Sequence, residues 1–101
     1  MSDIELLSID IGALESAIDS LNRYIGELSN EEGSLEYIKN TAPTFWNEGA
    51  TEDINSYCIE LGKNINSVDA LIQNLQGYIS TLRTLITEIN EARKRKYAGE
   101  V

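Results

Sequence analysis

Apolar residues recur along the second half of the chain in alternating steps of four and three. The series runs without a miss through Ile54, Cys58, Leu61, Ile65, Val68, Ile72, Leu75, Ile79, Leu82, Ile86 and Ile89. This is the heptad spacing of an amphipathic helix that packs along one side. The pattern predicts one long helix over about residues 51–95, with this series as its core or dimer seam.

A second apolar series lies beside the first on the same predicted helix. Its members each fall three residues after a member of the first series, with an interruption at Asn64: Tyr57, Leu71, Tyr78, Leu85 and Ala92. The apolar face is therefore wider than one partner helix covers, and we expect it to contact two neighbours. We also expect Cys58, Tyr57 and Tyr78 to lie in the core or at its edge rather than in a redox or ligand site.

The first half of the chain repeats the heptad spacing less perfectly. The series comprises Ile4, Leu7, Ile11, Leu14, Ile18, Leu21, Ile25 and Leu28, misses at Glu32, and resumes at Leu35, Ile38 and Ala42. Residues 29–34, SNEEGS, could form a turn, but Leu35 follows Leu28 by one heptad, so the register favours a single helix over about residues 10–42. Asp10 is the expected N-cap, although the spacing reaches back to Ile4 and leaves the start open between about residues 3 and 11.

Between the two predicted helices lie the only proline, phenylalanine and tryptophan of the chain, within residues 43–46. Pro43 disfavours helical geometry at the residue before it, and Thr51 followed by two acidic residues is typical of a helix start. We therefore expect a turn over residues 43–50 between antiparallel helices about 50 and 70 Å long. The predicted fold is all-α, a helical hairpin that dimerises into an elongated four-helix bundle.

Composition narrows the functional classes. The chain has 101 residues, 42% hydrophobic and 25% charged, which suits a single soluble domain over residues 1–101 with a flexible tail at 96–101. One cysteine and no histidine exclude an intramolecular disulfide, a zinc cluster of the usual type and histidine-based acid–base chemistry. We expect no catalytic residue, no cofactor and no metal, and therefore no enzyme.

The charge is strongly acidic and unevenly placed. The net charge is −9, but residues 93–96 hold four of the eight basic residues, so residues 1–92 carry 4 positive and 16 negative charges, or −12. Such a chain should repel nucleic acid and acidic membranes, and we expect neither nucleic-acid binding nor membrane insertion. The basic cluster falls where a helix should end, which favours the helix dipole. The first 30 residues lack the apolar run of a signal peptide, so we expect any export to proceed without a Sec leader.

Trp46 and Gly49 at the bend of a helical chain of about a hundred residues carry a resemblance to a known family. The chain resembles the WXG (Esx-like) family of small helical-hairpin proteins exported by type VII secretion systems, over nearly its whole length. The family pattern is Trp-x-Gly; here Gly49 comes one residue later, which gives a variant Trp-x-x-Gly turn. Ala50 supplies the small residue expected four positions after the tryptophan. Trp46 either caps the end of a bundle or takes part in recognition.

The C-terminal tail offers a second point of resemblance. Members of the family carry a secretion signal after the second helix, a tyrosine followed four positions later by an acidic residue. Here Tyr97 is followed by Glu100 at the third position, so the signal is degenerate or absent. The alternative is that residues 97–101 are simply a frayed terminus.

The resemblance implies a function by binding rather than by catalysis. It implies a secreted, virulence-type binding factor or secretion partner, present in the cytoplasm before export and recognised by the type VII secretion ATPase. The chain would pair with itself as a homodimer or with a related WXG-type chain as a heterodimer. Two alternatives stay open: an escort of a larger type VII effector, and an unrelated cytoplasmic coiled-coil adaptor.

Overall fold

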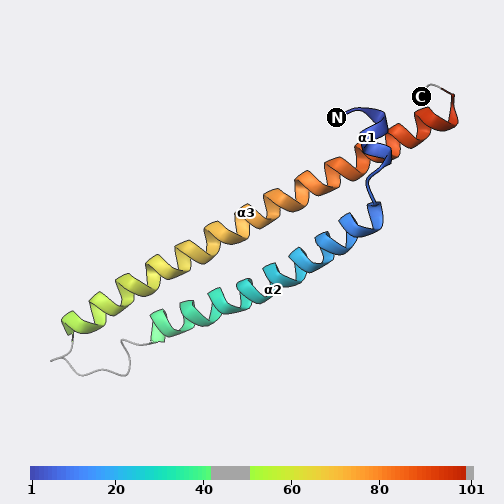
Figure 1. The fold of residues 1–101 in the computed structure, drawn as a ribbon. Coiled ribbons are helices and arrows are strands. Elements are labelled where there is room, and N and C mark those ends of the chain that lie inside the picture. The colour runs from blue at the N-terminus through green and yellow to red at the C-terminus, as the bar shows by residue number, and fades with distance from the viewer. Residues whose placement is uncertain (42–50, 100–101) are drawn as a thin grey trace. The chain divides into compact units, whose positions relative to one another are not determined.

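The described part of the chain is entirely helical in its regular structure. The computed structural model describes residues 1–41 and 51–99, and these contain three α-helices and no strand (Figure 1). The helices are α1 (Asp3–Leu7), α2 (Ile11–Thr41) and α3 (Thr51–Tyr97). The prediction of an all-α fold from the heptad spacing is confirmed.

Helix α2 begins at an aspartate cap and continues without a break. The backbone N–H of Gly12 donates to Asp10 Oδ1 at 2.9 Å, which satisfies one of the amide groups left free at a helix start. Residues 29–34 are helical, including Gly33, because the register set by Leu28 is taken up again by Leu35. The preference for one helix here is confirmed.

Helix α3 runs further than expected. The sequence placed the end of this helix near residue 95, and in the structure the helix continues through Lys96 and Tyr97. Residues 95–98 contain no proline or glycine, and Gly99 has a φ of 80°, in the left-handed region that favours glycine after a helix end. The N–H of Ala98 still donates to the carbonyl of Lys94 at 3.0 Å, so the helix stops only at this glycine.

The N-terminal residues form a short helix of their own, which the sequence did not resolve from the helix that follows. Ser2 Oγ accepts from the N–H of Glu5 at 3.2 Å and caps the start of α1. The N–H groups of Ser8 and Ile9 donate to the carbonyls of Glu5 and Leu6, both at 3.2 Å, and close its last turn. The chain then bends before Asp10 and enters α2.

The chain divides into two compact units. The terminal unit comprises residues 1–23 and 75–101, and the middle unit comprises residues 24–74. Helices α2 and α3 each contribute one part to each unit. In the middle unit Lys39 contacts Cys58, while Glu32, earlier in α2, interacts with Asp69, later in α3. The helices therefore run antiparallel there, which is consistent with a two-helix hairpin; the expected turn at 43–50 lies outside the described residues.

Candidate protein-interaction surfaces

The first apolar series of α3 is covered within the chain. Four members are buried: Ile54, Leu61, Ile79 and Ile89. The remaining seven are half-buried: Cys58, Ile65, Val68, Ile72, Leu75, Leu82 and Ile86. Because every member has lost much of its contact with water inside a single chain, this series forms the seam of the described helices.

The side chains of the second apolar series become less exposed toward the C-terminal end of α3. In the middle unit Tyr57 and Leu71 are exposed, and in the terminal unit Tyr78 is exposed as well. Further along the terminal unit Leu85 is half-buried and Ala92 is fully buried. Tyr57 and Tyr78, which we expected in the core or at its edge, are thus not buried in the single chain.

Helix α1 is what covers the end of this second series. Leu6 of α1 is buried in one cluster with Ile89 and Ala92 of α3, both of which have no exposed surface. Five partly buried residues pack around this cluster: Leu7, Ile9, Ile11, Leu14 and Leu85. Figure 1 shows α1 lying across the C-terminal part of α3, within the terminal unit. At this end of α3 the second neighbour of the wide apolar face is therefore α1 of the same chain.

An ion pair fixes α1 beside the basic end of α3. Arg95 Nε donates to Asp3 Oδ2 at 2.7 Å, and its second guanidinium nitrogen donates to Asp3 Oδ1 at 2.6 Å. Hydrogen bonding to Arg95 lowers the pKa of the Asp3 carboxyl, with a smaller contribution from the arginine charge and some opposition from burial. A lowered pKa means that the pair stabilises the fold above the ordinary aspartate pKa and loses this effect as pH falls through the folded value.

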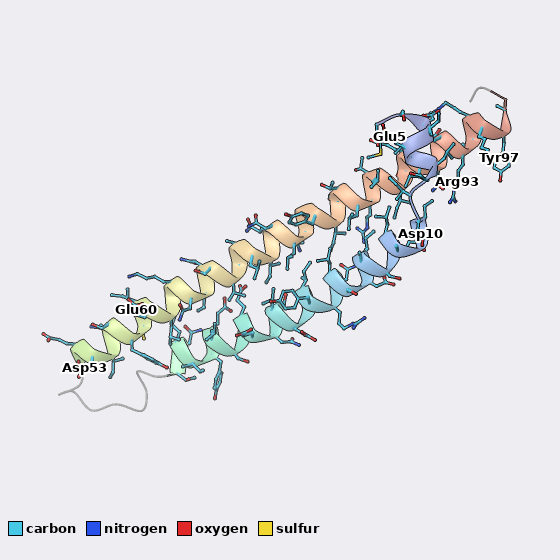
Figure 2. All side chains as sticks on the ribbon, viewed as in Figure 1. Glu5, Asp10, Asp53, Glu60, Arg93 and Tyr97 are labelled. Atoms are coloured by element: carbon cyan, nitrogen blue, oxygen red, sulfur yellow. The ribbon has the colours of Figure 1, made fainter. Side chains whose placement is uncertain are left out.

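The last turns of α3 carry the residues expected to take part in secretion. Arg93, Lys96 and Tyr97 line a hollow of about 260 Å³ together with Leu7. Tyr97 is 90% exposed, and Figure 2 shows it with Arg93 on these turns of the helix. Its predicted partner Glu100, like Trp46 and Gly49 of the turn motif, lies outside the described residues.

In the middle unit, polar and charged residues occupy positions of the apolar seam. Glu32, at the missed position of the α2 series, is half-buried. Burial, followed by the charges of Asp69 and Glu36, raises the pKa of its carboxyl. Cys58 Sγ donates weakly to the carbonyl of Lys39 at 3.6 Å, which aligns this end of α2 with the start of α3.

Comparisons with known proteins leave the resemblance to be judged on the chain's own residues. No family model, no curated protein and no solved structure matches the chain. None of the described helices combines the length and apolarity that a membrane crossing requires. Within residues 1–41 and 51–99, no three histidine, cysteine or acidic side chains are grouped to hold a metal ion.

Sequence reasoning missed the contact between α1 and α3. The heptad spacing of Ile4 and Leu7 left the start of the first helix open between about residues 3 and 11, whereas in the structure Leu6, which lies between them, is the buried residue of a separate helix. A local signal was present in Ser2, because a serine three residues before Glu5 is typical of a helix start. The ion pair joins residues 92 positions apart, and no local pattern indicates such a contact.

Proposed function

We propose that this chain is an Esx-like protein exported by a type VII secretion system, and that it acts by binding other proteins rather than by catalysis. The observation that carries the proposal is the helical arrangement. The antiparallel helices α2 and α3 flank residues 42–50, which hold Trp46 and Gly49 in the sequence. Helix α3 ends in an exposed tyrosine at position 97. This is the placement that the resemblance to the family implies for the turn motif and the tail.

We propose that the functional form is a homodimer in which two hairpins pair as a four-helix bundle. Exposed apolar residues of the second α3 series support this assembly, since Tyr57, Leu71 and Tyr78 remain in contact with water in a single chain. A heterodimer with a related WXG-type chain would use the same residues.

The export signal is proposed to be a composite of two subunits. In an antiparallel dimer the turn of one chain lies at the same end as the C-terminus of the other, so Trp46 and Gly49 would adjoin Tyr97 and Glu100 of the second copy. The basic residues 93–96 would provide positive charge beside this surface for the type VII secretion ATPase.

Export is tested with Trp46→Ala and with truncation after Lys96. Both variants should remain in the cell pellet, because each removes one half of the composite surface, while helicity and dimerisation stay near those of the parent. Tyr37→Ala is a control for loss of an aromatic side chain, since Tyr37 is an exposed residue of α2 that belongs neither to the turn motif nor to the tail. Culture supernatant and cell pellet are compared, together with circular dichroism and sedimentation.

Normal secretion of both variants would overturn the recognition role. Unfolding of the dimer by Trp46→Ala would show instead that Trp46 is a structural cap. Retention of the parent chain in the cytoplasm would favour the coiled-coil adaptor, and export only with a larger helical partner would favour the escort.

A further inference from the structure

Four exposed apolar residues of the middle unit share one side of the α2–α3 pair. Tyr24 and Ile38 belong to α2, and Tyr57 and Leu71 belong to α3. Tyr24, Tyr57 and Leu71 each immediately precede a position of the seam, namely Ile25, Cys58 and Ile72. Ile38, which the sequence assigned to the α2 series, is exposed instead, and it lies two heptads after Tyr24 on the same side of α2. In two helices that face each other and run antiparallel, the positions just before the seam fall on the same side of the pair. We call these four residues the aromatic face.

The aromatic face is accessible in the single chain. Tyr24, Ile38, Tyr57 and Leu71 are 47%, 40%, 48% and 39% exposed. Other exposed apolar residues of this unit, such as Tyr37 and Ile59, lie at other positions around their helices. Grouping of exposed apolar side chains on one side, rather than their mere exposure, is what indicates a surface for a partner.

The border of the aromatic face is acidic. Glu27 lies three residues after Tyr24, and Glu31 lies seven residues after it in the same helical row. On α3, Asp53 and Glu60 lie one turn on either side of Tyr57, and Figure 2 shows both on the first turns of this helix. Residues 24–74 contain nine acidic and two basic residues, a net charge of −7. A partner that covers this face should therefore bring positive charge.

The chain itself carries such a partner surface. Residues 1–23 and 75–101 contain eight acidic and six basic residues, a net charge of −2, with four of the basic residues at 93–96. Arg95 is engaged with Asp3, whereas Arg93 and Lys96 are exposed and Lys94 makes only a surface pair with Glu91 at 3.2 Å. Earlier in the part of α3 that belongs to the terminal unit, Tyr78 of the second apolar series is also exposed.

We propose that the aromatic face binds the C-terminal part of α3 from a second copy of this chain, and that the acidic border and the basic end set the antiparallel direction of the dimer. The inference rests on the homodimer of the proposed function. Pairing two middle units would bring together two surfaces of charge −7, whereas pairing the middle unit of one copy with the C-terminal end of the other brings together opposite charges.

Reversing the charges of the basic end tests whether they set the antiparallel direction of the dimer. The triple variant Arg93→Glu, Lys94→Glu and Lys96→Glu should raise the dimer dissociation constant in sedimentation equilibrium by roughly 10- to 100-fold at low salt. A control triple, Arg23→Glu, Lys63→Glu and Arg83→Glu, changes the net charge equally but leaves the C-terminal end intact. It should weaken the dimer far less.

A second set of substitutions, which makes the acidic border basic, restores opposite charges on the two surfaces. Glu27→Lys, Asp53→Lys and Glu60→Lys, added to the first triple variant, should return the dissociation constant close to that of the parent. The loss in the first triple should also shrink as salt is added, since exposed pairs are screened.

Three results would overturn the inference. If the first triple variant leaves the dimer dissociation constant unchanged, or if the control triple raises it equally, the basic end does not bind the aromatic face. If the three added lysines do not return the dissociation constant toward that of the parent, the acidic border does not contact the basic end. A parent that stays a folded monomer at every concentration overturns the homodimer itself, so the two proposals fail by different results.

Discussion

At the scale of single residues, Glu32 is the position where charge and packing conflict. It occupies the missed slot of the α2 heptad series, between Leu28 and Leu35, and it is half-buried near Asp69. Burial and neighbouring negative charge both disfavour its ionised form, which is why the pKa of its carboxyl is raised. The interruption seen in the sequence is thus a charged residue held in the seam, not a break in the helix.

Glu32→Gln should stabilise the protein at neutral pH. A carboxyl pKa that is higher in the folded than in the unfolded state lowers stability when the group is ionised. The gain from the neutral side chain should therefore be largest at pH 7 and should fade as pH drops and Glu32 becomes protonated. Denaturant unfolding of both proteins from pH 7 to pH 3 measures this difference. Glu15→Gln, at an exposed position of the same helix outside the acidic border, is the control, and an equal gain there would show that net charge alone is responsible.

At the scale of the elements, α1 depends on α3 for its existence. A helix of five residues is too short to be stable alone in water. It is held by the Ser2 cap, by burial of Leu6 and by the two hydrogen bonds between Arg95 and Asp3. In return, α1 shields Ile89 and Ala92, which have no exposed surface.

Leu6→Ala should release α1 from the terminal unit. Truncation of a buried leucine costs about 2–5 kcal/mol, and a short terminal helix can relieve part of this cost by detaching locally. We therefore expect faster amide hydrogen exchange over residues 85–92, with a smaller loss of global stability. Ile4→Ala is the control, because Ile4 is an exposed apolar residue of the same helix. Equal exchange in the two variants would contradict the role of Leu6 as the anchor.

At the scale of the whole molecule, the sequence predicted what local periodicity can encode. The steps of four and three from Ile54 to Ile89 predicted α3, and the heptad between Leu28 and Leu35 predicted that α2 would be continuous. The cover over Ala92 could not be predicted in this way, because it comes from Leu6, at the far end of the chain. The same holds for the ion pair of Asp3 with Arg95, so the bipartite terminal unit emerged only from the structure.

The two compact units should nevertheless unfold together, because α2 and α3 each pass from one unit to the other within an unbroken helix. If one unit unfolded, the helical segments of the other unit would be cut short. Because helix formation is cooperative, such shortened segments are less stable. We expect Ile89→Ala in the terminal unit and Leu61→Ala in the middle unit each to destabilise by about 2–5 kcal/mol, since both side chains are buried. Hydrogen exchange should accelerate in both units for either variant.

This comparison must be made at one fixed protein concentration, because self-association shifts apparent stability. Ile59→Ala, at an exposed position of α3, should change stability by less than about 0.5 kcal/mol and controls for loss of side-chain volume. If Ile89→Ala accelerates exchange only in residues 1–23 and 75–99 while residues 24–41 and 51–74 stay protected, the units fold independently. In that case unbroken helices would not be enough to couple the terminal unit to the middle unit.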